Sequence, residues 1–181
     1  VTYANNIFVS VSDNGSIYTS DNGTTWTPRN SGTSNPLRGV TYGNSIFVVV
    51  GNSGTVLTSS DNGTTWTPRT SGTSNPLRGV TYGNGIFLVV GNSGTVLTSP
   101  DGTTWTSRTS GVSTDLQEVT FGNNTYVAVG DSNTIVTSSD GSSWTSRTGN
   151  GNLTEVTFGD ETFVIIGGSG VLISSDNGTT W

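Results

Sequence analysis

Short apolar runs alternate with dense clusters of Gly, Asn, Ser and Thr along the whole chain. In one representative stretch the runs cover residues 40–42, 46–50 and 56–58, and each is rich in β-branched or aromatic residues. Turn-forming segments bound every run, and Gly43-Asn44 supplies residues that tolerate positive φ. Such runs predict strands joined by hairpins, and no stretch has the 3.6-residue apolar spacing of a helix. The pattern therefore predicts an all-β protein.

One motif recurs through the chain at a nearly constant interval. All five tryptophans end a copy of Ser-Asp-Asn-Gly-Thr-Thr-Trp or a close variant, at spacings of 40, 39, 39 and 37 residues. The motif residues are Asp21 and Trp26, Asp61 and Trp66, Asp101 and Trp105, Asp140 and Trp144, and Asp176 and Trp181. A period of this length indicates a repeat architecture. We expect one domain, residues 1–181, built from units 1–37, 38–77, 78–115, 116–152 and 153–181.

The strands within a unit differ in the burial that their composition predicts. The second strand is apolar at nearly every position, as in residues 46–50, and such a run is buried on both faces. The fourth strand carries Pro28 or Pro68 in the first two units, and proline belongs on an edge strand. This order predicts a β-propeller of five four-stranded blades of about 39 residues each. We favour a closed ring of five blades; the alternative is a window of a longer array.

Composition excludes several kinds of chemistry. The chain has no Cys, His, Met or Lys, which removes disulfides, thiolate and imidazole metal ligands, and Schiff-base chemistry. A net charge of -6 argues against nucleic acid or an anionic membrane surface as partner. The longest apolar run has five residues, far below the roughly 20 that span a bilayer. We therefore expect no metal, no cofactor, no nucleic acid and no membrane insertion.

The segment from Ser59 to Trp66 resembles the Asp-box, the S-x-D-x-G-x-T-W signature of sialidase-type (BNR repeat) β-propellers. The fifth unit matches fully, the first matches with Thr19 in place of Ser, and the third and fourth are one residue shorter between Asp and Gly. In these residues we expect the Asp side chain to cap its own turn, Gly to take the strained position and Trp to cover the hairpin. The resemblance implies that the box lies at the rim, away from the ligand face. Calcium binding is disfavoured because the ligand number of an EF-hand loop is absent.

The same resemblance brings in glycosidases, because the family includes true sialidases. It would imply an arginine triad, a Tyr nucleophile with a Glu partner, and an acidic Asp. Four arginines instead recur at one outer-strand position, which indicates a repeated structural salt bridge or hydrogen bond; they are Arg29, Arg69, Arg108 and Arg147. Glu118 and Glu155, at equivalent positions of adjacent units, are the candidate carboxylate pair for glycoside hydrolysis. Nothing in their sequence surroundings indicates a shifted pKa, so we expect no catalytic residue.

The candidate binding residues lie where the repeat is least regular. We expect the linkers 30–39 and 70–79 to share one face of the propeller with the turns 51–54, 91–94, 130–133 and 167–170. The candidates on this face are Arg38, Arg78, Gln117, Glu118, Thr154, Glu155, Asn52, Asn92 and Asp131. Polar, amide-rich side chains of this kind suit sugars or peptide backbones, and repeated weak sites act by avidity.

Three functions remain open. The first is a non-enzymatic recognition or display module at a cell or particle surface, binding a glycan or a protein, within a larger surface assembly. The alternative is a structural or assembly-factor propeller, which includes a resemblance to the Asp-box propellers that help assemble photosynthetic complexes. A sialidase-like glycosidase is the third. A Lys-free and Cys-free chain rich in Thr, Ser, Asn and Gly is typical of extracellular or particle-surface proteins, so we expect that location.

Overall fold

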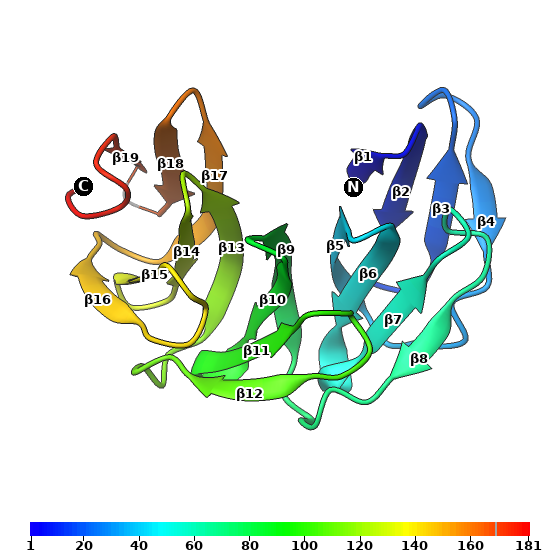
Figure 1. Ribbon diagram of the computed structural model, residues 1–181, viewed down its shortest axis with the longest axis horizontal. Helices are drawn as coiled ribbons and strands as arrows, with labels where there is room; N and C mark the ends of the chain where they lie inside the picture. The colour runs from blue at the N-terminus through cyan, green and yellow to red at the C-terminus, as the bar shows by residue number, and fades with distance from the viewer. Residues whose placement is uncertain (169) are drawn as a thin grey trace.

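The computed structural model describes residues 1–168 and 170–181, which form five antiparallel sheets set side by side in an arc (Figure 1). We call these sheets blades and number them in chain order. In each blade the strands are hydrogen-bonded in sequence order, from an inner strand to an outer strand. The expected all-β propeller architecture is confirmed.

The first blade contains β1 (Thr2–Ala4), β2 (Ile7–Val11), β3 (Ile17–Ser20) and β4 (Thr27–Arg29). The second contains β5 (Leu37–Gly43), β6 (Ile46–Gly51), β7 (Val56–Ser59) and β8 (Thr67–Arg69). The third contains β9 (Leu77–Gly83), β10 (Ile86–Gly91), β11 (Thr95–Ser99) and β12 (Thr106–Thr109). The fourth contains β13 (Leu116–Gly122), β14 (Thr125–Gly130), β15 (Thr134–Ser138) and β16 (Thr145–Thr148). The fifth contains β17 (Leu153–Gly159), β18 (Thr162–Gly167) and β19 (Gly170–Ser174).

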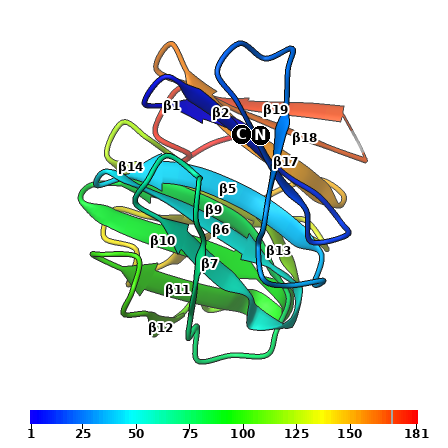
Figure 2. The ribbon, with the colours of Figure 1, turned by 90° about the vertical axis from the view of Figure 1, so that its right-hand side faces the viewer.

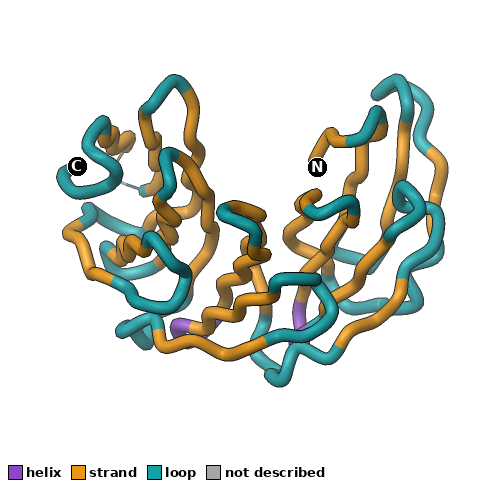
Figure 3. Tube along the Cα trace, viewed as in Figure 1, coloured by secondary structure: helices purple, strands orange, loops and turns teal. Residues whose placement is uncertain are grey.

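In residues 1–168 and 170–181, helical structure is restricted to short turns, as Figure 3 shows. The 3-10 turns η1 (Asn52–Gly54) and η2 (Asn92–Gly94) follow the second strands of blades two and three. Over the described ranges no helix is long and apolar enough to cross a membrane.

The hydrophobic core lies between blades rather than within them. Each blade has a leading face toward the next blade and a trailing face toward the previous one. Val48, Val50 and Val56 on the leading face of blade two pack against Phe87 and Val89 on the trailing face of blade three. Three more clusters of the same kind fill the other blade boundaries. Every residue of 47–50 is fully buried, and the second strands of blades three and four are buried in the same way, which confirms the prediction for these blades. In blade five the prediction is wrong, because Ile166 is 47% exposed.

The tight turn between β5 and β6 lies in the expected segment, residues 42–45, but Gly43 is not one of its two positive-φ residues. Asn44 and Ser45 both have positive φ (46° and 63°), which suits a two-residue hairpin loop. Gly43 is not needed for the turn. It lies beneath the ring of Tyr82 in blade three, and a Cβ at this position would come within 2.1 Å of the Tyr82 Cγ. This glycine therefore permits close packing between blades.

The expected closed ring of five four-stranded blades is wrong in two respects. The fifth blade has three strands, and the first and fifth blades flank an opening in the arc (Figure 1). Side chains at equivalent positions pack at the four boundaries between consecutive blades, and the resulting arc leaves blade five apart from blade one (Figure 1). The leading face of blade five is accordingly uncovered: Val171 is 60% exposed, whereas its equivalent Val56 is 1% exposed.

Candidate functional site

Four of the predicted binding residues occupy a β-bulge at the start of an inner strand. In blade two, Leu37 pairs with Gly51 and Gly39 pairs with Val50, which leaves Arg38 unopposed. The same slip recurs in blades three, four and five, where the bulged residues are Arg78, Gln117 and Thr154. We call these four residues the bulge row. A bulge re-aims the side chain of its extra residue, so this position projects differently from its strand neighbours.

The structure brings the bulge row together with the predicted turn residues. Arg38 Nε donates to Asn52 Oδ1 at 3.4 Å, and Arg78 Nε donates to Asn92 Oδ1 at 2.8 Å. In blade four, Gln117 Nε2 donates to Asp131 Oδ1 at 3.1 Å. In blade five, Thr154 Oγ1 donates to the carbonyl oxygen of Ile166 at 3.3 Å. We call the end of the blades that carries the bulge row and the turns after the second strands the loop end. It therefore carries a row of hydrogen-bonded polar side chains.

Asp13, which sequence reasoning missed, distinguishes the two arginines of this row. Its Oδ1 accepts from Arg38 Nη1 at 2.7 Å and forms an ion pair across the boundary between blades one and two. The equivalent position in the next blade is Asn52, at the start of η1. A sequence signal existed, because an acidic residue stands in the first unit where the second and third have asparagine.

Glu118 and Glu155 line a central cavity of about 560 Å³, together with Arg38 and residues of the inner strands. Figure 2 shows two of these strands, β5 and β9, side by side. Glu118 is partly buried, and its Oε1 accepts from the Val119 N–H at 2.9 Å. Burial raises the pKa of Glu118 to about 7, and the negative charge of Glu155 contributes to the rise. Glu118 and Glu155 occupy equivalent positions on neighbouring inner strands, which places both carboxylates in one cavity.

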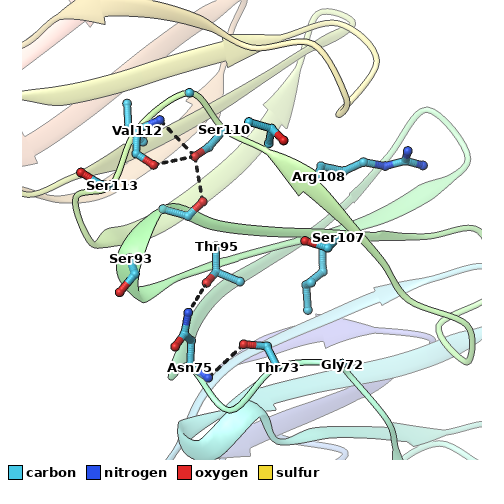
Figure 4. Close-up of a pocket in the computed structure, with 14 residues that line it drawn as sticks. Gly72, Thr73, Asn75, Ser93, Thr95, Ser107, Arg108, Ser110, Val112 and Ser113 are labelled. Atoms are coloured by element: carbon cyan, nitrogen blue, oxygen red, sulfur yellow. Dashed lines mark hydrogen bonds between the residues drawn. The ribbon is translucent and has the colours of Figure 1, made fainter.

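A larger cavity of about 590 Å³ lies between the linker 70–79 and the outer strands of blade three (Figure 4). Its polar groups bond to one another. Asn75 Nδ2 donates to Thr95 Oγ1 at 2.9 Å, and Ser110 Oγ donates to the carbonyl oxygen of Gly94 at 2.8 Å. These bonds connect the linkers to the blades, so we interpret this cavity as a structural contact between them.

The Asp-containing hairpins form the hydrogen-bonded turn expected from their residues. Asp61 Oδ1 accepts from the Thr65 N–H at 2.9 Å, and Oδ2 accepts from Thr65 Oγ1 at 2.6 Å. Ser59 Oγ accepts from the Gly63 N–H at 2.9 Å. Bonds from Thr65 lower the pKa of Asp61 to about 2. The carboxyls of Asp101, Asp140 and Asp176 accept equivalent bonds, and their pKa values are also lowered.

Asp21 does not have the expected role in the first hairpin. Asn22 Oδ1 accepts from the N–H groups of Thr24 and Thr25, both at 2.9 Å, and Ser20 Oγ accepts from the Gly23 N–H. The strand register explains the difference, because Ser20 pairs with Phe8 as Ser59 pairs with Phe47. The first hairpin is therefore of the shorter type seen in blades three and four, with Asn22 in place of the aspartate.

Among the described residues, four of the five tryptophans donate to a carbonyl oxygen of their own hairpin, and Trp144 Nε1 has no such partner. Trp66 Nε1 donates to the carbonyl oxygen of Gly63 at 3.0 Å, and its ring packs against the cluster shared by blades one and two. Trp105, Trp144 and Trp181 pack in the same way on the blades before them. Trp26 has no preceding blade in this chain and is 36% exposed.

The repeated outer-strand arginines make hydrogen bonds. Arg29, Arg69, Arg108 and Arg147 each donate from Nε to a threonine Oγ1 on the neighbouring strand. Within the described part of the chain, the one ion pair is that of Arg38 and Asp13. Of the two structural alternatives expected for these arginines, the hydrogen bond is confirmed.

Comparisons with known proteins agree with this architecture. Residues 33–117 match the family model described as a DUF6242 beta propeller domain. The comparison with curated proteins gave no match. Together with the five blades, these findings define the chain as a β-propeller-like protein.

Solved structures give the same result at low sequence identity. YCF48 bound to D1 peptide matches with a TM-score of 0.73 and 21% identity, covering 96% of this chain and 61% of that chain. The WD40 beta propeller domain of Doa1 matches with a TM-score of 0.75 and 13% identity, covering 97% and 63%. The computationally designed Ika8 protein matches with a TM-score of 0.71 and 17% identity, covering 91% and 53%. This chain thus spans between half and two thirds of these chains, and the likeness concerns the fold.

Proposed function

We propose that this chain is a structural or assembly-factor propeller that holds a segment of a protein partner at its loop end and catalyses no reaction. The observation that carries the proposal is the bulge row. Four equivalent positions, aimed by one backbone irregularity, carry Arg38, Arg78, Gln117 and Thr154. A purely architectural position would be expected to repeat, as the outer-strand arginines do.

The charged side chains of the inner strands suit a polar protein segment. Arg38 and Arg78 belong to blades two and three, whereas Glu118 and Glu155 belong to blades four and five. The glycines Gly39 and Gly79 take the places of the two glutamates in the earlier blades. Cationic and anionic groups are therefore divided between the two halves of the arc. Complementary charge of this kind favours one orientation of a bound segment over its reverse.

The likeness to YCF48, which was solved with a bound D1 peptide, supports a protein partner at the level of fold analogy. The recognition of glycans, display at a cell or particle surface, and an extracellular location stay predictions.

Absence of catalysis is part of the proposal, and the glycosidase alternative is open to a direct test. A carboxyl with a pKa of about 7, such as that of Glu118, has the protonation that a glycosidase acid needs. Its Oε1, however, already accepts the Val119 N–H. We expect no release of fluorophore from sialosides or other glycosides. Turnover that disappears in Glu118→Gln would contradict the proposal.

Parallel binding arrays distinguish the two non-enzymatic functions. The full chain is applied to a peptide array that varies acidic, basic and neutral segments, and to a glycan array. We expect signals on the peptide array that fall when Arg38 and Arg78 are both changed to Gln, the residue of blade four at this position. Outer-strand Arg108→Gln is the matched control. Glycan signals without peptide signals would favour the recognition module instead.

A further inference from the structure

Two hydrogen-bond donors recur at the blade boundaries of the loop end. One is the side chain of the bulge row. The other is the backbone N–H of the turn residue in the preceding blade, represented by Ser53 in η1 and Ser93 in η2. These two serines have nearly the same conformation, with φ and ψ of 57° and 32° for Ser53 and of 56° and 37° for Ser93.

At each of two boundaries, a carboxylate of the chain itself accepts a hydrogen bond from one of these donors. Between blades one and two, Asp13 Oδ1 accepts from Arg38 Nη1 at 2.7 Å. Between blades three and four, Asp115 Oδ1 accepts from the Ser93 N–H at 2.8 Å. The boundary between blades four and five uses an amide, because Asn152 Oδ1 accepts from the Ser132 N–H at 3.0 Å.

Among the described residues, the boundary between blades two and three lacks such a carboxylate. Asn52, whose Oδ1 accepts from Arg38 Nε, stands where blade one has Asp13, and Pro76 stands where the next linker has Asp115. Arg78 is held by its Nε bond to Asn92. Among the described residues, no carboxylate lies within ion-pair distance of Arg78, and no side chain accepts the Ser53 N–H. A partly buried guanidinium is thus positioned with its Nη groups available.

We propose that the boundary between blades two and three binds a carboxylate group of a protein partner, held by the Arg78 guanidinium and the Ser53 N–H. This site rests on the proposed function and names the chemistry of the partner. Guanidinium and carboxylate form short, charge-assisted hydrogen bonds, and the Asp13–Arg38 pair shows that geometry one repeat earlier. The carboxylate belongs either to an acidic side chain or to a C-terminus.

The test follows the Nε–H resonances of the six arginines and the Ser53 amide by NMR while short peptides are added. One peptide carries an internal Glu and an amidated C-terminus, and a second is neutral with a free C-terminal carboxylate. Selective shifts at Arg78 and Ser53 with either peptide support the site, and the peptide that acts identifies the source. A neutral amidated peptide is the control. Equal shifts with that control, or no shift with either carboxylate, overturn the proposal.

Asn52→Asp supplies the missing carboxylate from within, at the position from which Asp13 accepts from Arg38, without removing Arg78. We expect it to weaken peptide binding at least about tenfold, a loss typical of a charge-assisted contact. Ser93→Asp is the control that adds the same charge to the next turn, whose N–H already has Asp115. Unchanged binding in Asn52→Asp overturns the site. If the partner segment found on the peptide array still binds this variant, the proposed function stands while the carboxylate site fails.

Discussion

At the scale of single residues, the Asp hairpins show how one side chain fixes a turn. Asp61 accepts two bonds from Thr65 and one from Ser59, and these bonds hold the pKa of its carboxyl at about 2. Because this pKa lies below that of the unfolded chain, the stabilisation is present above about pH 4 and is lost as the pH falls through 2.

We therefore expect Asp61→Ala to lower the free energy of unfolding at pH 7 by about 1 kcal/mol, since solvent screens an exposed carboxylate. Asp21→Ala is the matched control and should change stability by less than about 0.5 kcal/mol, because Asn22 makes the bonds of that hairpin. Urea unfolding of both variants checks this. Equal losses would contradict the reassignment of the first hairpin.

Glu118 has the opposite dependence on pH. Its pKa of about 7 lies above the ordinary value of 4.5 for a glutamate, chiefly because of its partial burial and secondarily because Glu155 is near; the bond from the Val119 N–H and the α-amino group of Val1 act in the other direction. A raised pKa means that its contribution to stability is full below about pH 4.5 and is lost as the pH rises through 7. We therefore expect the unfolding midpoint of the wild type to fall as the pH rises through 7, and Glu118→Gln to remove this fall. A fall of the same size in the variant would show that other groups cause it.

At the scale of elements, the unit of stability is the boundary between two blades. Trp66 packs on blade one, whereas the equivalent Trp26 lies on an open face. We expect Trp66→Ala to cost about 2–4 kcal/mol, near the lower part of the range for large aromatic truncations because the ring is partly exposed. Trp26→Ala should cost less. Thermal or urea unfolding decides, and an equal cost would mean that the tryptophans act only within their own hairpins.

A glycine pair tests the same boundary from the other side. A Cβ on Gly43 would overlap Tyr82 of the next blade, whereas a Cβ on Gly159 meets nothing within 4 Å. We expect Gly43→Ala to lose about 1–3 kcal/mol through overpacking, and Gly159→Ala to be near neutral. Calorimetric melting of the two variants gives the comparison. Two neutral results would show that neighbouring blades can separate at little cost.

The elements were largely predictable from sequence, because strand composition and turn residues are local signals. The repeat identified the hairpins and the buried second strands. Two features depended on contacts that no local pattern carries. Gly43 looked like a turn residue until Tyr82 of the next blade was placed above it. The bulge that aims Arg38 arises from strand register, and register is set by pairing with β6.

At the scale of the whole molecule, the arrangement of blades separates architecture from recognition. The repeated residues, such as the outer-strand arginines and the tryptophans, join strands or blades. The residues that break the repeat gather at the loop end and in the central cavity, and include Arg78 and Glu118. Sequence reasoning identified these positions, but it did not distinguish Arg38 from Arg78, because the difference depends on an ion pair with Asp13 across a blade boundary.

Peptide binding by two arginine variants is the decisive measurement. Affinity for the amidated Glu-containing peptide is measured by calorimetry for the wild type, Arg78→Gln and Arg38→Gln. We expect Arg78→Gln to weaken binding at least about tenfold, because hydrogen bonds to charged groups contribute about 1.5–3 kcal/mol. Arg38→Gln should change affinity less than about twofold, because the Arg38 guanidinium is already paired with Asp13. Loss of this exposed ion pair should also have little effect on stability. Equal effects of the two substitutions, or no effect of either, would contradict a carboxylate site between blades two and three.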